Sequence, residues 1–254
     1  MKDYKQLFDV FICGGSQHVH LLSPLLRKLQ PYGKVHLASS FLSETDLDQL
    51  LGLYDLLHTP RHSPNGYNNF ELFSIRDINR LAQAPYFVKL DADVDLEPDW
   101  IAYVEECLAA YPDVVLFGPL KGNNAINFQV SGTLVRQLIE RDIRVTNACK
   151  VAGGFYVGKT SFFKEHQRLM DIVHELMWCY KDGVRYRPSI NPEYWPPEEM
   201  NSEPVTLVGG SENFQGNEDV LRNLVVHAVG AGDRLHVFDS QGRIRIDRSN
   251  TMNP

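Results

Sequence analysis

The sequence has few cysteines, no long apolar run and no basic excess, and each absence excludes a class of protein. The four cysteines, Cys13, Cys107, Cys149 and Cys179, lie far apart and form no Cys-x-x-Cys pair, so we expect neither a disulfide framework nor a zinc site. No apolar run approaches the roughly 20 residues of a membrane-spanning helix. The charged first residues lack the apolar segment of a signal peptide.

The charge balance is acidic, with 25 Lys and Arg against 32 Asp and Glu and a net charge of −7. A protein that binds the phosphate backbone of nucleic acids needs a basic face, so we expect no nucleic-acid partner. The 254 residues, 43% of them hydrophobic, suit a globular protein with one large core. Together with the missing membrane span, this composition predicts a cytoplasmic protein that is an enzyme by its size.

Apolar segments of strand length alternate with segments of helical period in the first half of the chain. The expected strands are 8–13, 34–38, 86–90 and 114–117, and the expected helices lie near 23–30, 44–53, 70–83 and 99–110. The strands are continuously apolar, which favours burial on both faces, as in a parallel sheet. This order predicts an α/β fold with a mostly parallel central sheet flanked by helices.

The second half of the chain is less regular and contains no repeat or linker, so we expect a single domain. A strand is expected at 151–157, a long helix at 161–180 and a last helix at about 218–229. Residues 234–246 have the pattern of a β-hairpin. Residues 182–216 are rich in Pro, Glu, Asn and Gly, and a loop of this length in a compact domain is commonly functional.

The most informative segment contains two acids separated by one residue, Asp91 and Asp93, directly after an apolar strand. In parallel sheets, ligands bind beyond the carboxyl ends of the strands. Two such acids repel each other unless a cation or proton neutralises them. Carboxylate oxygens suit Mg²⁺ or Mn²⁺, which commonly also ligate substrate phosphates. The segment therefore predicts a divalent-metal site at the end of this strand.

Other interpretations of the acidic segment compete with the metal site. A calcium-binding EF-hand loop that began at Asp91 would need Gly and Glu where Leu96 and Ala102 stand, which excludes it. Phosphatases of the haloacid dehalogenase type also have Asp-x-Asp after a strand, but after the first strand of the chain rather than in its middle. A solvated turn before a helix with an acidic start is the remaining structural alternative.

Residues 90–100, Leu-Asp-Ala-Asp-Val-Asp-Leu-Glu-Pro-Asp-Trp, resemble the Asp-x-Asp segment of GT-A-fold nucleotide-sugar glycosyltransferases, in particular the family-2-like branch. The resemblance implies a Rossmann-related GT-A domain over residues 1–254. Its first half, to about residue 120, would bind the nucleotide sugar and its second half the acceptor. Asp93 would be the principal ligand of Mn²⁺ or Mg²⁺, and Asp91 would contact the ribose or the metal.

The resemblance also implies further contacts with the nucleotide sugar. Arg76 lies in the expected helix before the acidic segment, where the family often has an Arg beside the nucleotide. The first strand ends in Cys-Gly-Gly-Ser instead of the family's Thr-Tyr-Asn-like turn, which makes Gly14 and Ser16 the corresponding contacts. Gly153 and Gly154 resemble the glycine-rich strand beside the donor sugar and the acceptor.

A second acidic pair, Glu218 and Asp219, opens the last expected helix and resembles the acceptor-side Glu-Asp of inverting GT-A enzymes. One general base suffices for a single displacement with inversion, and we favour Asp219, with Glu218 as second choice. Acids after Asn217 are equally the ordinary chemistry of a helix start. His236 corresponds to the late His that completes the metal site in several such enzymes, although a lone strand His more often packs or lies on the surface.

Residues 153–160 match the P-loop expression Gly-x-x-x-x-Gly-Lys-[Ser/Thr], but the physics of the segment disagrees with it. A phosphate-binding loop turns tightly, whereas Phe-Tyr-Val at 155–157 favours an extended strand. We therefore expect no phosphate-binding loop here.

The resemblance implies a metal-dependent, inverting glycosyltransferase. It would move one sugar from a nucleotide sugar, with a UDP-sugar favoured, to a hydroxyl of a small molecule or glycan. The Gln-x-x-Arg-Trp motif of processive synthases is absent, which favours single transfers. The alternatives are a phosphohydrolase or P-loop nucleotide enzyme, and a non-catalytic module that binds nucleotide sugars.

Overall fold

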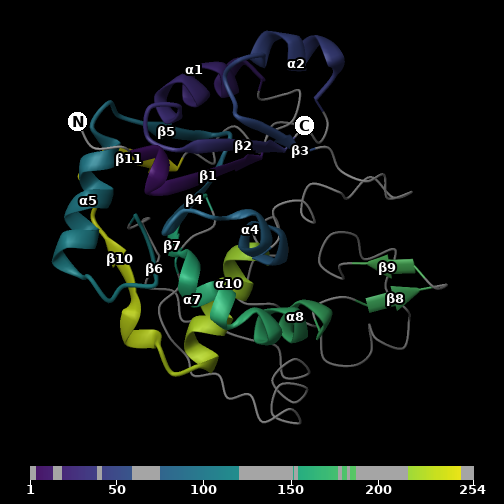
Figure 1. Ribbon diagram of the computed structural model, residues 1–254, viewed down its shortest axis with the longest axis vertical. Coiled ribbons are helices and arrows are strands. Elements are labelled where there is room, and N and C mark those ends of the chain that lie inside the picture. The colour runs from purple at the N-terminus through teal and green to yellow at the C-terminus, as the bar shows by residue number, and fades with distance from the viewer. Residues whose placement is uncertain are drawn as a thin grey trace.

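The computed structural model shows a central sheet with helices on both faces (Figure 1). It describes residues 4–13, 19–38, 42–58, 75–119, 151, 154–176, 179–181, 184–186 and 217–246. Within these residues, the sheet has seven strands in the order β10-β6-β7-β4-β1-β2-β3. These strands are β1 (Phe8–Cys13), β2 (Lys34–Ala38), β3 (Leu56–His58), β4 (Tyr86–Asp91), β6 (Leu116–Pro119), β7 (Phe155–Lys159) and β10 (Leu235–Phe238).

Six of the seven strands run in one direction, and β7 runs antiparallel between β4 and β6. This arrangement confirms the predicted α/β fold with a mostly parallel sheet in a single domain. The continuous apolar strands explain it, because each central strand buries side chains on both faces.

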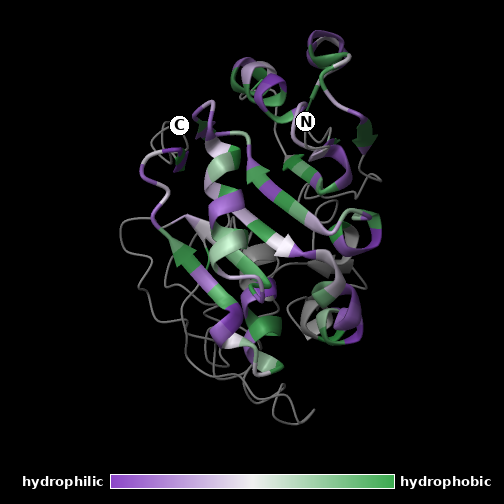
Figure 2. Cartoon of the chain, turned by 60° about the vertical axis from the view of Figure 1, so that its left-hand side comes forward, coloured by the Kyte–Doolittle hydropathy of each residue, from purple (hydrophilic) through white to green (hydrophobic). Residues whose placement is uncertain are grey.

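One face of the sheet is covered by α1 (Val19–Leu29), α2 (Glu44–Leu50) and α5 (Trp100–Ala110). The other face is covered by α4 (Ile75–Leu81), α7 (Thr160–Glu165), α8 (Gln167–Leu176) and α10 (Asn217–Ala228). Figure 2 shows mainly hydrophobic bands along the central strands, with a few hydrophilic bands between them. The buried polar residues of these strands are Asp9, His36 and Lys89. They all lie on the α4–α10 face, because strand side chains alternate between faces.

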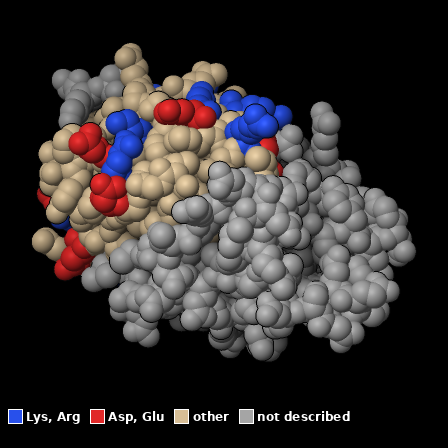
Figure 3. All heavy atoms as spheres, turned by 90° about the horizontal axis from the view of Figure 1, so that it is seen from below, with Lys and Arg blue, Asp and Glu red and all other residues tan. Residues whose placement is uncertain are grey.

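The remaining elements are short and lie outside this sheet. They are η1 (Tyr4–Gln6), β5 (Val94–Leu96), β8 (Cys179–Lys181), β9 (Val184–Tyr186), η4 (Gly232–Arg234) and β11 (Ile244–Ile246). Among the described residues, no helix has the length and apolar character needed to cross a membrane. On the face seen in Figure 3, acidic and basic side chains lie next to one another.

The predicted hairpin over residues 234–246 is wrong. β10 pairs in parallel with β6, and β11 pairs antiparallel with β5. Ile244 of β11 is buried against the core together with Val94 and Leu96 of β5, and at the surface Arg245 contacts Asp95 and Glu97 of the β5 region. Arg243 adds a bidentate ion pair to Glu106 of α5, at 2.9 and 2.8 Å.

The predicted long helix at 161–180 is also shorter than expected. The chain forms α7 and α8 with His166 between them, and residues 179–181 belong to strand β8. The strand expected at 151–157 begins later, at Phe155, and the one expected at 114–117 begins at Leu116.

Candidate functional site

The carboxyl ends of the parallel strands bring several of the predicted site residues to one edge of the sheet. Cys13, the last residue of β1, is in register with Ala38 of β2 and with Asp91 of β4. The antiparallel β7 begins at the same edge, where the N–H of Asp91 donates to the carbonyl oxygen of Gly154 at 2.9 Å. The edge therefore combines the end of β4 with the start of β7.

Three of the residues predicted for this edge lie outside the described residues. Gly14 and Ser16 follow β1 directly in the chain, and Gly153 precedes Gly154. Arg76 lies in α4, but only its backbone is described. Gly154 itself has a packing reason to be glycine, because a Cβ there would lie 2.5 Å from the Cγ2 atom of Ile246.

Asp93 lies in the turn between β4 and β5, between the buried side chains of Ala92 and Val94. Its own side chain is half-buried. The turn is fixed on its far side by Asp95, which bonds to Arg245 and Lys28. The hydrogen bond from Arg245, followed by the contact with Lys28, lowers the pKa of Asp95 despite some burial. Asp95 thus stabilises the turn through its ion pairs, and Asp93 lies in the same turn at the carboxyl edge of the sheet.

Sequence reasoning missed Lys89, which lies two residues before Asp91 and on the same face of β4. Its side chain is 4% exposed, and its Nζ lies 2.6 Å from the Oδ1 atom of Asp91, whose side chain is 42% exposed. The ammonium also lies 5.9 Å from the centre of the Tyr156 ring. The sequence did contain a signal for this ion pair, namely a lysine inside an apolar strand, two residues before an acid.

The ion pair changes the electrostatics of the edge. Lys89 neutralises one carboxylate of the acidic pair, so Asp91 and Asp93 do not stand together as two uncompensated charges. Among the described residues, no group of three or more His, Cys, Asp and Glu side chains is arranged to hold a metal ion. Two carboxylates still fit Mg²⁺ or Mn²⁺, because such ions usually bind through one or two carboxylates plus substrate phosphates and water.

The structure does not bring His236 to the acidic pair, contrary to the sequence expectation. His236 lies in β10, in register with Phe117 of β6, and both β6 and β7 separate β10 from β4. Three strand spacings amount to roughly 14 Å across the sheet. His236 instead packs against aromatic rings, 4.6 Å from Tyr111 and 5.4 Å from Phe238 between ring centres. The structural alternative to a metal ligand was a packed histidine, and this alternative describes His236.

The second acidic pair lies in the first turn of α10, although the side chains of Glu218 and Asp219 are outside the described residues. β10 begins shortly after α10 ends and runs parallel to β4, so α10 runs back from the carboxyl edge of the sheet toward the amino edge. The side chain of Asn223 bonds to both backbone groups of Val151, just before β7, at 2.9 and 3.1 Å. The first turn of α10 therefore lies on the side of the acidic edge.

Arg222 fixes α10 against the sheet. It is fully buried, its Nε donates to the hydroxyl oxygen of Tyr156 at 3.0 Å, and its Nη1 donates to Asn79 at 3.4 Å. Its Nη2 has no hydrogen-bond partner in the described part of the chain. The guanidinium instead lies 4.5 Å from the ring centre of Phe87 and 5.1 Å from that of Phe163. Cation–π contacts of this kind offset part of the cost of burying the charge.

No protein-family model and no curated protein matches this sequence. Several solved structures resemble the fold of this chain. Mouse xyloside xylosyltransferase 1 aligns over 98% of this chain and 99% of that chain, at 12% identity and a TM-score of 0.48. TarS from S. aureus aligns over 92% of this chain and 58% of that chain, at 10% identity and a TM-score of 0.47.

A complex of TarS with UDP-GlcNAc aligns over 63% of this chain and 47% of that chain, at 10% identity and a TM-score of 0.40. The chain thus spans about half the length of the TarS structures, 47–58%. Mannose-1-phosphate geranyltransferase from Thermus thermophilus aligns over 92% of this chain and 74% of that chain, at 12% identity and a TM-score of 0.44.

The P-loop interpretation fails on geometry. Phe155–Lys159 is an extended strand between β4 and β6, so its backbone N–H groups serve the sheet and do not converge on a phosphate. Gly158, the second glycine of the expression, has a packing role: a Cβ there would lie 2.1 Å from the Cζ atom of Phe87. The sequence expectation of a strand is confirmed.

A second polar cluster lies on the α4–α10 face of the sheet, the face that also carries Lys89. The sequence did not indicate this cluster, because its members come from three strands. The Nε2 atom of His36 lies 3.2 Å from the Oδ1 atom of Asp9, and its Nδ1 atom lies 3.1 Å from the Nε2 atom of His58. The other carboxylate oxygen of Asp9 accepts the N–H groups of Gln83 and Ala84. Burial opposes ionisation of Asp9, but these hydrogen bonds, led by that of His36, lower its pKa.

Proposed function

We propose that this protein is a GT-A-type glycosyltransferase that uses a nucleotide sugar. The observation that carries the proposal is the meeting at one edge of the sheet of Asp91, the Asp93 turn and the start of β7, with the first turn of α10 on the same side. The carboxyl edge of a parallel sheet is where α/β proteins bind their ligands. The resemblance of residues 90–100 to the Asp-x-Asp segment supports the proposed class independently of the geometry.

On the donor side, Asp93 and Asp91 would hold Mn²⁺ or Mg²⁺. When bound, such an ion neutralises the charge of the leaving nucleoside diphosphate. Lys89 holds the Asp91 carboxylate at 2.6 Å, which leaves Asp93 as the principal ligand in this proposal. Gly14, Ser16 and Arg76 would contact the nucleotide, with UDP favoured, and Gly153 and Gly154 would lie beside the sugar.

On the acceptor side, Asp219 would act as general base. The hydroxyl oxygen of the acceptor attacks the anomeric carbon, the bond from that carbon to the diphosphate oxygen breaks, and the hydroxyl proton passes to the Asp219 carboxylate. One such displacement inverts the anomeric configuration. The acceptor is a small molecule or a glycan held by residues after about position 120, and each encounter transfers one sugar.

The test is a transfer assay with UDP-, GDP- and TDP-sugars, read by release of the nucleoside diphosphate and by the anomeric configuration of the product. Asp219→Asn should lower turnover about 100-fold or more with little change in donor affinity, because general bases contribute that much. Glu218→Gln, the matched neighbour, should retain most of the rate.

Two outcomes would replace the proposal. Release of phosphate from simple phosphate esters, without sugar transfer, would favour a phosphohydrolase. Nucleotide-sugar binding without turnover on any acceptor would favour a non-catalytic module. A product that keeps the configuration of the donor would remove Asp219 from the role of inverting base.

A further inference from the structure

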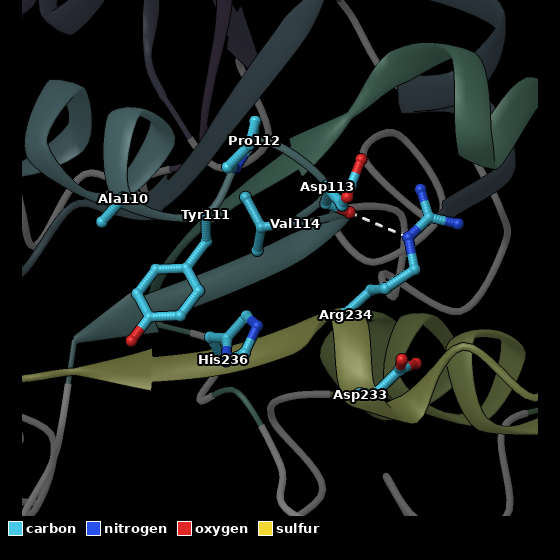
Figure 4. A pocket seen from close by; sticks show the side chains of 8 residues that line it. All are labelled: Ala110, Tyr111, Pro112, Asp113, Val114, Asp233, Arg234 and His236. Atoms are coloured by element: carbon cyan, nitrogen blue, oxygen red, sulfur yellow. Dashed lines mark hydrogen bonds between the residues drawn. The ribbon is translucent and has the colours of Figure 1, made fainter.

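A pocket opens at the amino edge of the sheet, opposite the acidic edge. It has a volume of about 740 Å³, within the range of roughly 300–1,000 Å³ that is typical of small-ligand sites. Its walls are the segment from α5 to β6 and the segment from η4 into β10. Figure 4 shows the eight residues that line it: Ala110, Tyr111, Pro112, Asp113, Val114, Asp233, Arg234 and His236.

One wall of this pocket carries an exposed aromatic ring. Tyr111 is 45% exposed, an unusual state for a large ring in the described residues, and its ring lies beside that of His236 (Figure 4). Phe238 extends the row, 5.0 Å from Tyr111 and 5.4 Å from His236. Backing by two further rings holds the Tyr111 ring in place, so an apolar ligand face can stack on it with little loss of side-chain freedom.

Both walls also carry polar groups: Asp113 comes from the segment between α5 and β6, and Asp233 and Arg234 come from the segment from η4 into β10. The side chains of Asp113 and Asp233 make no hydrogen bond or ion pair with the described residues. Arg234 uses its Nε to donate to the backbone oxygen of Asp113 at 2.8 Å, and its Nη groups make no hydrogen bond to the described residues. The guanidinium is held from behind by the ring of Phe162, 5.5 Å away.

These groups select the chemistry of a ligand. The two carboxylates repel an anionic ligand, and the guanidinium of Arg234 repels a cationic one. The carboxylates and His236 do not form a metal-ligand group within the described residues. A neutral molecule with one apolar face and a rim of hydroxyl groups satisfies every group, because its hydroxyls donate to carboxylates and accept from a guanidinium. A pyranose ring has this construction.

We propose that this pocket is a carbohydrate-binding site for a neutral glycan, separate from the acidic edge. A sugar ring stacks on Tyr111, and its hydroxyl groups bond to Asp113, Asp233 and Arg234. The proposal does not depend on the proposed transfer reaction, since the two sites lie at opposite edges of the sheet. It also gives His236 a role, as the ring that supports Tyr111.

The test uses cellohexaose, maltohexaose, xylohexaose and chitohexaose, each titrated against the full chain and followed by saturation-transfer NMR and calorimetry. At least one of them should bind, with an affinity that does not change with salt. Tyr111→Ala should weaken that binding about tenfold or more, and Tyr111→Phe should preserve it, because stacking requires the ring and not the hydroxyl. Asp93→Asn should bind like the unchanged protein.

Tyr111→Leu keeps apolar bulk without a planar ring and should lose binding like Tyr111→Ala, which guards against a folding defect in the alanine variant. The proposal is overturned if none of the four oligosaccharides binds, or if binding survives in both variants. Loss of binding in Asp93→Asn would place the sugar at the acidic edge instead. Preference for a sulfated heparin hexasaccharide over the neutral ones would overturn the neutral class.

Discussion

At the scale of single residues, the chain of polar side chains from the buried Asp9 and His36 to the half-buried His58 ties acid sensitivity to the fold. Asp9 is 3% exposed and His36 1% exposed, so their polar atoms depend on each other and on the backbone of residues 83–84. Burial, with a further contribution from His36, lowers the pKa of His58 from 6.5 to about 4. Between pH 6.5 and about 4, His58 therefore stays neutral in the folded protein but binds a proton in the unfolded chain.

We predict that the free energy of unfolding falls as the pH falls from 6.5 toward about 4, where His58 is protonated only in the unfolded chain. The lowered pKa of Asp9 acts in the same direction at still lower pH, because protonation costs the folded state its hydrogen bonds to the carboxylate. The measurement is the urea midpoint against pH. His58→Gln should flatten the curve in this window, and His20→Gln, at an exposed helix position, controls for the loss of a histidine as such.

A pH curve that His58→Gln leaves as steep as before would contradict this assignment. Acid sensitivity would then come from other groups, and the buried chain of side chains would be only a packing feature.

At the scale of elements, β7 must pass closely under Phe87. Gly158 is a strand residue with no room for a side chain, since a Cβ would lie 2.1 Å from the Cζ atom of Phe87. Phe87 cannot move freely, because it also contacts Phe163 at 5.7 Å and Arg222 at 4.5 Å between ring or guanidinium centres. The packing of β7 against β4 therefore requires this glycine.

Gly158→Ala should lower the free energy of unfolding by about 1–3 kcal/mol, the usual cost of overpacking a core. Phe87→Leu introduced together with it should recover part of the loss, because the smaller side chain leaves room for the new Cβ. A double-mutant cycle by urea unfolding measures this coupling. Strictly additive losses would contradict the contact.

The anchoring of α10 is a second property of an element. Tyr156→Phe removes the oxygen that accepts from the fully buried Nε of Arg222 and should cost about 1–3 kcal/mol of unfolding free energy. Tyr111→Phe, at an exposed ring, is the matched control and should change stability by less than about 0.5 kcal/mol. Equal stability of the two variants would contradict the role of Arg222 as anchor.

The elements also show how far the sequence predicts the fold. β1, β2 and β4 followed from continuous apolar runs with clear breaks, and the position of Asp91 at a strand end followed with them. The pairing of β11 with β5 did not follow from the sequence, because it joins residues about 150 positions apart, such as Arg245 and Asp95. The same holds for the Asp9–His36–His58 chain, whose members come from three strands and show no local spacing.

At the scale of the whole molecule, the net charge of −7 conflicts with binding a phosphorylated donor unless positive charge is supplied locally. Lys89 supplies one such charge beside Asp91. The proposed Mn²⁺ or Mg²⁺ at Asp93 would bridge the acidic edge and a diphosphate. Metal dependence of nucleotide binding is therefore the claim on which the proposed function depends most directly.

The measurement that tests this claim is calorimetric titration of UDP into the protein with and without Mn²⁺. We predict that UDP binds with Mn²⁺, that removal of the ion abolishes detectable binding, and that Asp93→Asn does the same. Asp95→Asn is the matched control from the same segment, and it should retain binding because Asp95 bonds to Arg245 and Lys28. Equal UDP binding with and without Mn²⁺, or undiminished binding by Asp93→Asn, would contradict the account.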